Sequence, residues 1–291
     1  MGYYLVPPVY RPPSEAHSLI LQVTLGCSHN ACSFCVAYKG KKFRVKTWPE
    51  IEADIEAAKK YYPNATRIFL ADGNAMVADT GLLLKVLEKV HRDFPYLERI
   101  GIYARASDFL EKTPEDLKKL SEAGIGLVYY GLESGSDRIL KMIHKGETVS
   151  QMIEGGHKAM EAGLPLSITF IIGLGGPELS EEHAKETAAA ASAINPAYLS
   201  ALTMFIPEGS FMDRKLKRGE FKLLTPEQTL RELKILLENI LLENCVFRSN
   251  HASNYLPLKG VLNRDRDKML AMIDKALANP RLLRPEFLRG L

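Results

Sequence analysis

Short apolar runs alternate with amphipathic segments along most of this 291-residue chain, and no other feature constrains its fold as strongly. Each run is rich in apolar and β-branched residues, as expected of a strand that is buried on both faces. Strands that alternate with helices favour a parallel sheet with right-handed crossovers. The sequence therefore predicts an α/β protein, with either an open doubly wound sheet or a full or partial barrel. The predicted strands are Ser18–Thr24, Arg67–Ala71, Arg99–Ala104, Gly126–Leu132, Leu166–Ile172 and Ala197–Phe205.

Helix-start signals stand between the predicted strands. Thr47–Glu50 and Thr113–Asp116 each combine a Thr cap with a Pro and an acidic residue in the first turn. The alternation of strands and helices stops after Pro207. Beyond it we expect a long helix over residues 225–244 and a last helix over residues 264–278.

Three of the four cysteines fall within nine residues, at Cys27, Cys32 and Cys35, directly after the first predicted strand. Clustered cysteines in a large chain with few others indicate a metal site before a disulfide framework. Ligands of parallel α/β folds bind at the carboxyl ends of strands, where this loop is expected. Three thiolates can hold three irons of a 4Fe-4S cluster and leave the fourth iron open.

A structural zinc site is the main alternative, because His29 would complete a Cys3His set with the three clustered cysteines. Inert buried thiols fit less well beside the polar residues Ser28 and Asn30. The fourth cysteine, Cys245, is expected at the end of the long helix, where a packing role is favoured over a role as an extra ligand.

The cysteine loop resembles that of the radical S-adenosylmethionine (SAM) superfamily. The usual spacing there is C-x3-C-x2-C, whereas this chain has C-x4-C-x2-C, and the aromatic Phe34 before the last cysteine matches the family pattern. The resemblance spans roughly Ser18 to Pro207. It implies that Cys27, Cys32 and Cys35 bind a 4Fe-4S cluster whose open iron chelates SAM. Reductive cleavage of SAM would then yield methionine and a 5′-deoxyadenosyl radical that abstracts a substrate hydrogen.

Turns at later strand ends extend the resemblance to the branch of the methylthiotransferases, elongator-type enzymes and coproporphyrinogen oxidases. Glycine allows close backbone approach to a ligand, and a carboxylate can accept hydrogen bonds from ribose hydroxyls or an ammonium group. Glu133 and Ser134 lie in a G-x-E-S-G segment, and Gly173 opens the Gly-rich turn beside the adenosine. The SAM-binding residues that the resemblance implies are Phe34, Asp72, Gly73, Asn74, Glu133, Ser134 and Gly173.

With this resemblance the fold prediction becomes a partial (β/α)6 TIM-like barrel with a mostly helical C-terminal extension. The predicted domains are an extended N-terminal segment at residues 1–17, the barrel at 18–207 and the extension at 208–291. The roles of two basic residues, Arg105 and Lys145, remain open. Arg105 is expected to meet a SAM or substrate carboxylate, or to pair with Asp108. Lys145 lies where related enzymes often carry a basic residue, and it is equally placed to stabilise a helix end.

The polar segment Phe247–Tyr255 carries many hydrogen-bonding groups without a helix or strand period. Placed after the sixth strand, it could return over the barrel mouth and contact the substrate, or it could be a solvated loop. The candidate substrate contacts are Arg248, Asn250, His251, Asn254 and Tyr255.

Charge and hydropathy limit the partners. The net charge of +3 is too small for a broad nucleic-acid surface, although residues 1–47 and 248–291 are both basic and favour an anionic ligand. No export signal or apolar run long enough for a membrane span is visible, so a cytoplasmic location is expected. We expect a small-molecule or peptide substrate, with tRNA as the alternative, and an electron donor such as flavodoxin or ferredoxin. A zinc- or cluster-binding protein without SAM chemistry is the alternative function.

Overall fold

The computed structural model describes residues 3–290 of the chain, and residues 1, 2 and 291 of the predicted terminal segments lie outside it. The fold divides into two compact units. The first unit holds residues 3–30, 37–130 and 154–166, and the second holds residues 31–36, 131–153 and 167–290. The domain boundaries predicted at 17/18 and 207/208 stay predictions.

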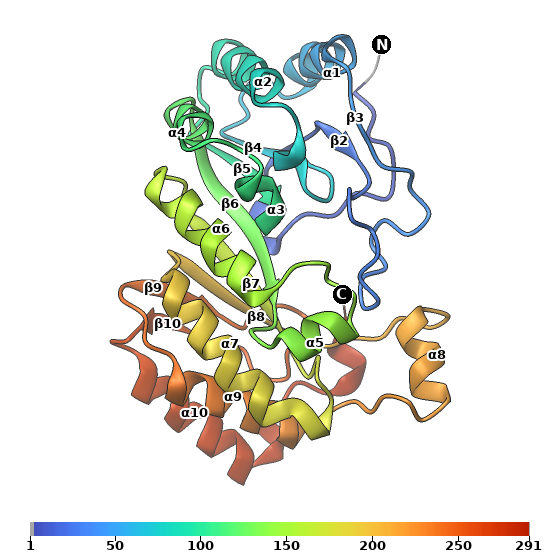
Figure 1. Cartoon of the computed structure of the whole chain (residues 1–291), viewed down its shortest axis with the longest axis vertical. Coiled ribbons are helices and arrows are strands. Elements are labelled where there is room, and N and C mark those ends of the chain that lie inside the picture. The colour runs from blue at the N-terminus through green and yellow to red at the C-terminus, as the bar shows by residue number, and fades with distance from the viewer. Residues whose placement is uncertain (1–2, 291) are drawn as a thin grey trace. The chain divides into compact units, whose positions relative to one another are not determined.

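The first unit is built on parallel strands with helices packed outside them (Figure 1). Strand β4 pairs with β1 and β5, and β5 pairs with β6, all in parallel. Helices α1 and α2 pack against each other. The bounds are β1 (Leu19–Gln22), β2 (Thr24–Leu25), β3 (Arg44–Val45), α1 (Trp48–Tyr61), β4 (Arg67–Ala71), α2 (Thr80–Asp93), β5 (Arg99–Ala104), α3 (Ala106–Leu110), α4 (Pro114–Glu122), β6 (Ile125–Glu133) and α6 (Val149–Glu161), of which β6 ends and α6 begins in the second unit.

Alternate residues of these strands form an apolar cluster. Phe69 of β4 packs edge-on against Tyr103 and Tyr129, with ring centroids 4.8 and 5.7 Å apart. Leu5 and Val9 of the N-terminal segment pack against the same cluster. The N-terminal segment is thus part of the core that supports the strand ends.

The second unit continues the βα pattern and closes with an antiparallel strand. Strands β7, β8 and β9 are parallel to one another, and β10 runs antiparallel to β9. Helix α9 packs between α7 and α10 on one side of these strands (Figure 1). The bounds are α5 (Asp137–Met142), β7 (Leu166–Ile172), α7 (Ser180–Ile194), β8 (Tyr198–Thr203), α8 (Phe211–Lys217), α9 (Pro226–Asn239), β9 (Cys245–Arg248), β10 (Lys259–Leu262) and α10 (Arg266–Ala278).

The predicted α/β class is confirmed, and three strands have the predicted bounds: Arg67–Ala71, Arg99–Ala104 and Leu166–Ile172. The predicted helix over residues 225–244 was too long. It ends at Asn239, because side chains of the α7 end capture the following backbone: Leu241 N donates to Ser192 Oγ (2.8 Å) and Glu243 N to Asn195 Oδ1 (3.0 Å).

The prediction for Cys245 was wrong in its secondary structure. Cys245 begins strand β9 and does not end a helix, and the polar segment begins inside that strand with Phe247 and Arg248. Val246 pairs with Tyr198 of β8, so the parallel strands continue into the predicted helical extension. The thiol of Cys245 is fully buried, in line with the expected packing role.

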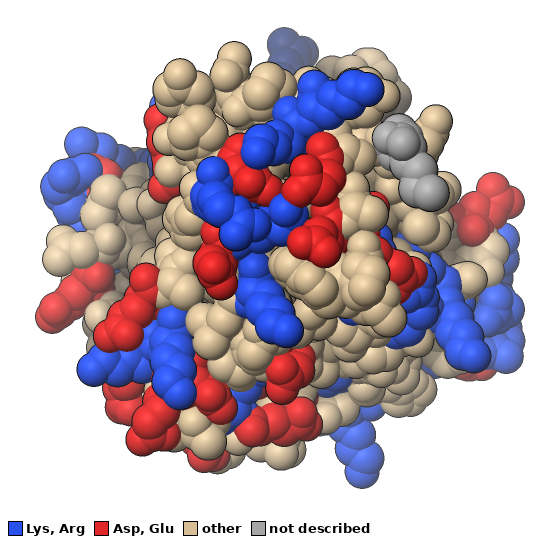
Figure 2. Space-filling model, turned by 90° about the horizontal axis from the view of Figure 1, so that it is seen from above, with Lys and Arg blue, Asp and Glu red and all other residues tan. Residues whose placement is uncertain are grey.

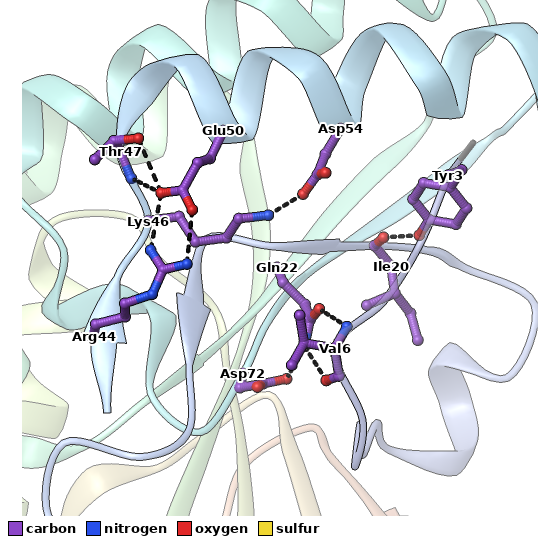
Figure 3. Close-up of polar contacts among 10 residues, drawn as sticks. All are labelled: Tyr3, Val6, Ile20, Gln22, Arg44, Lys46, Thr47, Glu50, Asp54 and Asp72. Carbon is purple, nitrogen blue, oxygen red and sulfur yellow. Dashed lines mark hydrogen bonds and ion pairs between the residues drawn. The ribbon is translucent and has the colours of Figure 1, made fainter. Parts of the chain in front are cut away.

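Three of the six basic residues between positions 3 and 47 form ion pairs with acidic side chains of the first unit. The guanidinium of Arg44 forms two hydrogen bonds to Glu50, and Lys46 pairs with Asp54 (Figure 3). On the face seen in Figure 2, basic and acidic side chains are interspersed. Half of the basic residues of this region thus have a nearby acidic partner, and the expected anionic ligand stays a prediction. Within residues 3–290, no helix combines the length and apolar character needed to cross a membrane.

Candidate SAM and cluster site

The turn after β4 carries a buried carboxylate that holds the start of the cysteine loop. Asp72 is fully buried, and its Oδ2 accepts hydrogen bonds from Gly26 N (3.1 Å) and Lys41 Nζ (2.5 Å). Its Oδ1 accepts a hydrogen bond (3.0 Å) from Nε2 of Gln22, which is the last residue of β1 (Figure 3). The side chain predicted to lie in the SAM-binding turn is thus bonded to the backbone that precedes Cys27.

The next two residues of this turn contact the loop as well. A Cβ atom at Gly73 would lie 2.6 Å from the Cα and Cβ of Cys27, so only glycine permits this approach. Asn74 is fully buried; its Oδ1 accepts from Ser28 N (3.1 Å), and its Nδ2 donates to Asp108 Oδ1 (2.9 Å). The predicted turn and the first predicted cluster ligand are therefore in direct contact.

The loop between the first two cysteines contains one residue with a positive φ, Asn30. Its φ of +41° is in the left-handed region, which asparagine tolerates better than most residues. Asn30 Nδ2 donates to Tyr38 O (2.8 Å), and Lys39 Nζ donates to Asn30 O (2.8 Å). The backbone between Cys27 and Cys32 is thus held by hydrogen bonds at Asn30.

The three clustered thiols are divided between the units. Cys27 lies in the first unit, whereas Cys32 and Cys35, with the half-buried Phe34 between them, lie in the second. All three are half-buried, and none of the four cysteines forms a disulfide. Within residues 3–290, no three Cys, His, Asp or Glu side chains already surround a common point as metal ligands would. The donor set is nevertheless suited to an iron–sulfur cluster, because three accessible thiols are what such a cluster needs.

A buried ion pair stands next to Cys32. Lys145 Nζ lies 3.1 Å from Glu133 Oε1, with exposed side-chain fractions of 6% and 13%. Burial works against the ammonium, but the charges of Glu133 and then Cys32 outweigh it and raise the pKa of Lys145. Ser33 N donates to Ile143 O (2.8 Å), which ties the Cys32 loop to the segment that carries Lys145.

The backbone before Glu133 is shaped for this pair. Glu133 has a φ of +61°, and a Cβ atom at Gly131 would lie 2.2 Å from Glu133 Oε1. Glycine at position 131 therefore leaves the space that the carboxylate occupies. The predicted contact of Glu133 with SAM stays a prediction, and the structure adds Lys145 as its partner.

Ser134 serves the packing of α7. It is fully buried, and its hydroxyl lies 2.9 Å from His183 Nδ1. His183 Nε2 lies 2.9 Å from Ile171 O, which can only accept, so Nε2 carries the hydrogen and Nδ1 accepts from Ser134. Burial lowers the pKa of His183 to about 4, so the ring is neutral. The structure gives Ser134 a packing role, and its predicted contact with SAM stays a prediction.

The glycine turn after β7 is held by a carboxyl group from α9. Gly173 has a φ of +83°, and its N–H donates to Glu232 Oε1 (2.7 Å). Glu232 also accepts from Ser180 Oγ (2.5 Å) and is 2% exposed. Burial raises the pKa of Glu232 to about 7. The conformation of this turn thus depends on a side chain from the C-terminal part of the chain.

Arg105 begins helix α3. Its backbone N–H donates to Asp108 Oδ2 (2.9 Å), and its side chain is half-buried. Asp108 also accepts from Asn74, so the residue expected as the partner of Arg105 belongs to the network around the cysteine loop. The role of the Arg105 side chain toward a carboxylate stays a prediction.

The polar segment does return to a strand end. Asn254 is buried and bonds to two β8 residues, through Thr203 Oγ1 (2.9 Å) and Ala201 O (2.7 Å). Tyr255 stacks on Arg289 and donates to Glu286 (2.9 Å). Both side chains thus hold the segment in place, and their contact with a substrate stays a prediction.

Three candidates of the segment retain a solvent-accessible side chain. Asn250 is exposed, and Arg248 and His251 are half-buried. Burial and, secondarily, the charge of Arg284 lower the pKa of His251. The segment thus presents Arg248, Asn250 and His251 near the carboxyl end of β8.

The sequence alone did not predict the buried hydrogen-bond partners of the site residues. Gln22, Lys41 and Glu232 each bond to a predicted site residue from a distant part of the sequence. The available signal was weak: a Gln that ends an otherwise apolar strand and a Glu on the apolar face of a helix are both unusual.

Comparison with known proteins assigns the chain to a family. Residues 21–191 match the model of the radical SAM superfamily. The chain is 27% identical over 168 residues to a putative methylthiotransferase of Methanocaldococcus jannaschii. It is 34% identical over 169 residues to the bacteriochlorophyllide d C-8(2)-methyltransferase of Chlorobaculum tepidum. Each match covers 53% of this chain and 35% of the relative, so the chain matches about a third of the length of these relatives.

The fold is similar to that of methylornithine synthase, with a TM-score of 0.55 at 16% identity, over 90% of this chain and 80% of that one. This likeness supports the predicted fold type. Because the superfamily match spans more than half of the chain, this protein belongs to the radical SAM superfamily, whose members use a 4Fe-4S cluster and S-adenosylmethionine.

Proposed function

We propose that this chain is a radical SAM enzyme in which Cys27, Cys32 and Cys35 hold the 4Fe-4S cluster. The observation that carries the proposal is the contact between the turn after β4 and Cys27, where Gly73 leaves no room for a side chain. A site for SAM on an open iron needs a backbone turn beside the cysteine loop, and this turn is so placed.

The chain's own residues supply binding and orientation. The backbone of Asp72–Asn74 would receive the SAM amino group, and Glu133 would accept a hydrogen bond from its ribose or its ammonium. Gly173 would let the backbone approach the adenosine. A cluster held by Cys27, Cys32 and Cys35 would supply the electron for reductive cleavage of SAM, the chemistry by which a hydrogen-abstracting radical is formed.

The substrate that we propose is a small molecule or a peptide. The carboxyl end of β8 presents Arg248, Asn250 and His251, which offer a cation, an amide and an imidazole to a polar substrate. A macromolecular substrate such as tRNA gains no support from the mixed charges of Figure 2. A flavodoxin or ferredoxin would serve as the electron donor.

Transfer of a methyl or methylthio group is a specific form of this proposal. It is favoured by the names of the two relatives, a putative methylthiotransferase and a methyltransferase. Mass analysis of a reacted substrate separates this outcome, which adds a carbon or sulfur group, from simple hydrogen removal.

The test begins with anaerobic purification and reconstitution. We expect about four irons per chain, and 5′-deoxyadenosine when SAM and dithionite are added. Single Cys→Ala variants at positions 27, 32 and 35 should lose both, whereas Cys245→Ala should keep both. Stoichiometric zinc without SAM cleavage would instead support the alternative of a zinc-binding protein.

A further inference from the structure

The turn after β4 and the cysteine loop are in contact over three consecutive residues of each. Each contact is of a different kind: a carboxylate with a backbone N–H, a glycine against a Cα, and an amide with a backbone N–H. The contacts run in parallel, from Asp72 to Gly26, from Gly73 to Cys27 and from Asn74 to Ser28. The backbone on both sides of Cys27 is therefore fixed by side chains of one turn.

The Asp72 carboxylate is committed to protein partners. Both of its oxygens accept hydrogen bonds, and the side chain has no exposed surface. Lys41, whose side chain is 7% exposed, provides the neutralising charge. Hydrogen bonds between a carboxylate and an ammonium are shorter and stronger than those between neutral groups.

The same network reaches the N-terminal segment. Lys41 Nζ donates to Pro8 O (3.0 Å), and Gln22 bonds to both backbone groups of Val6 (Figure 3). Gln22 thus lies between Val6 and Asp72. The position of the loop before Cys27 is thereby tied to a segment whose Leu5 and Val9 are anchored in the core.

Asn74 completes the arrangement on the other side of Cys27. Its amide both accepts from Ser28 N and donates to Ser28 Oγ (2.9 Å), which fixes the orientation of that residue. Asp108 accepts the remaining hydrogen of the amide, so the amide cannot rotate without losing hydrogen bonds.

We propose that Asp72 and Asn74 are positioning residues that fix the Cys27 loop for cluster binding, an inference that rests on the proposed role of Cys27. Their side chains act on the cluster through the loop and do not contact SAM. Groups that orient a metal ligand in this way affect metal affinity by about 10–100-fold.

The test compares Asp72→Asn and Asn74→Ala with the wild-type chain after anaerobic reconstitution. The rate of iron loss to a ferrous chelator and the electron paramagnetic resonance spectrum of the reduced cluster are measured. We expect iron loss to be about 10–100-fold faster in both variants, with a changed spectrum. Asn74→Ala leaves the buried charges balanced, so it decides the question if Asp72→Asn does not fold.

Glu15→Gln is the matched control. Glu15 is a fully buried carboxylate of the same unit, and it pairs with Arg99 at 2.6 Å. It should lose thermal stability while iron release and the spectrum stay as in the wild type. The inference is overturned if Asn74→Ala releases iron at the wild-type rate, or if Glu15→Gln releases it equally fast. A wild-type chain that takes up no iron would instead overturn the proposed function, and this inference with it.

Discussion

Lys145 and Glu133 form a buried ion pair 3.1 Å long, next to one of the clustered cysteines. Removing one partner of such a pair leaves the other charge buried without compensation. We predict that Lys145→Met lowers the free energy of unfolding by about 3 kcal/mol, measured by urea denaturation. Without the ammonium, the thiolate of Cys32 is less favoured, so alkylation of Cys32 by iodoacetamide should slow. Lys141→Met, at an exposed position of α5, should change neither quantity.

Gly73 and Gly40 provide a matched pair of glycines. A methyl group at Gly73 would meet the backbone of Cys27 at 2.6 Å, whereas no heavy atom lies within 4 Å of the corresponding position at Gly40. We expect Gly73→Ala to cost about 1–3 kcal/mol and to reduce the iron content after reconstitution. Gly40→Ala should preserve both. Equal behaviour of the two variants would argue against a close approach at Gly73.

Three of the four thiols should react with an alkylating reagent in the native chain, and the fourth should be protected. Burial raises the pKa of Cys245 to about 12, and the side chain is inaccessible. The other three cysteines are half-buried. In the metal-free native chain, mass spectrometry should detect alkylation at Cys27, Cys32 and Cys35, and at Cys245 only after denaturant is added. Modification of Cys245 in the native chain would contradict its assignment as a core residue.

Two buried groups near the glycine turn should oppose each other in their effect on pH stability. Glu232 has a pKa raised from 4.5 to about 7, so its stabilising contribution is present below pH 4.5 and is lost as the pH rises toward 7. His183 has a pKa lowered from 6.5 to about 4, so its contribution is present above pH 6.5 and is lost as the pH falls toward 4.

Single variants should reveal these two opposing contributions. On acidification from pH 7 to 4.5, Glu232→Gln should lose stability relative to the wild type, and His183→Gln should gain it. Each difference should be no larger than about 3 kcal/mol. Denaturant unfolding at several pH values measures both, and parallel curves for all three proteins would show that neither group titrates in this range.

Variants of Asn254 and Asn250 should distinguish a structural role from a role in contacting the substrate. Asn254 is buried with hydrogen bonds to two residues of β8, so Asn254→Ala should cost about 1–3 kcal/mol. Asn250 is exposed, and Asn250→Ala should stay within about 0.5 kcal/mol of the wild type. Turnover lost in Asn250→Ala, with 5′-deoxyadenosine still produced, would support a substrate contact.

The strands could be predicted from the sequence because short apolar runs indicate buried segments. Arg67–Ala71 is apolar at every position after the first, and all of those positions are buried. The end of α9 could not be predicted, because Leu241 and Leu242 continue the apolar pattern. Hydrogen bonds from the backbone N–H groups of Leu241 and Glu243 to Ser192 and Asn195 stop the helix, and these are tertiary contacts that a local pattern does not encode.

In the candidate site, too, the local sequence predicted where a residue lies but not which distant residues it contacts. The family resemblance predicted that Asp72 lies in a SAM-binding turn at the end of a strand. Its partner Lys41 is 31 positions away in the sequence, and no spacing rule connects the two. The hydroxyl of Ser134 is likewise bonded to His183, which is 49 positions away in the sequence, and its contact with SAM stays a prediction.

Strand β9 limits how far the chain can be shortened from its C-terminal end. It pairs with β8 through Val246, Phe247 and Arg248, and therefore covers the backbone of that strand. A chain cut at Asn244 would expose the unpaired N–H and C=O groups of β8 together with the apolar side of α9. Such an edge recruits strands from other molecules. A version that ends at Asn244 would therefore aggregate, although it would still contain all three clustered cysteines.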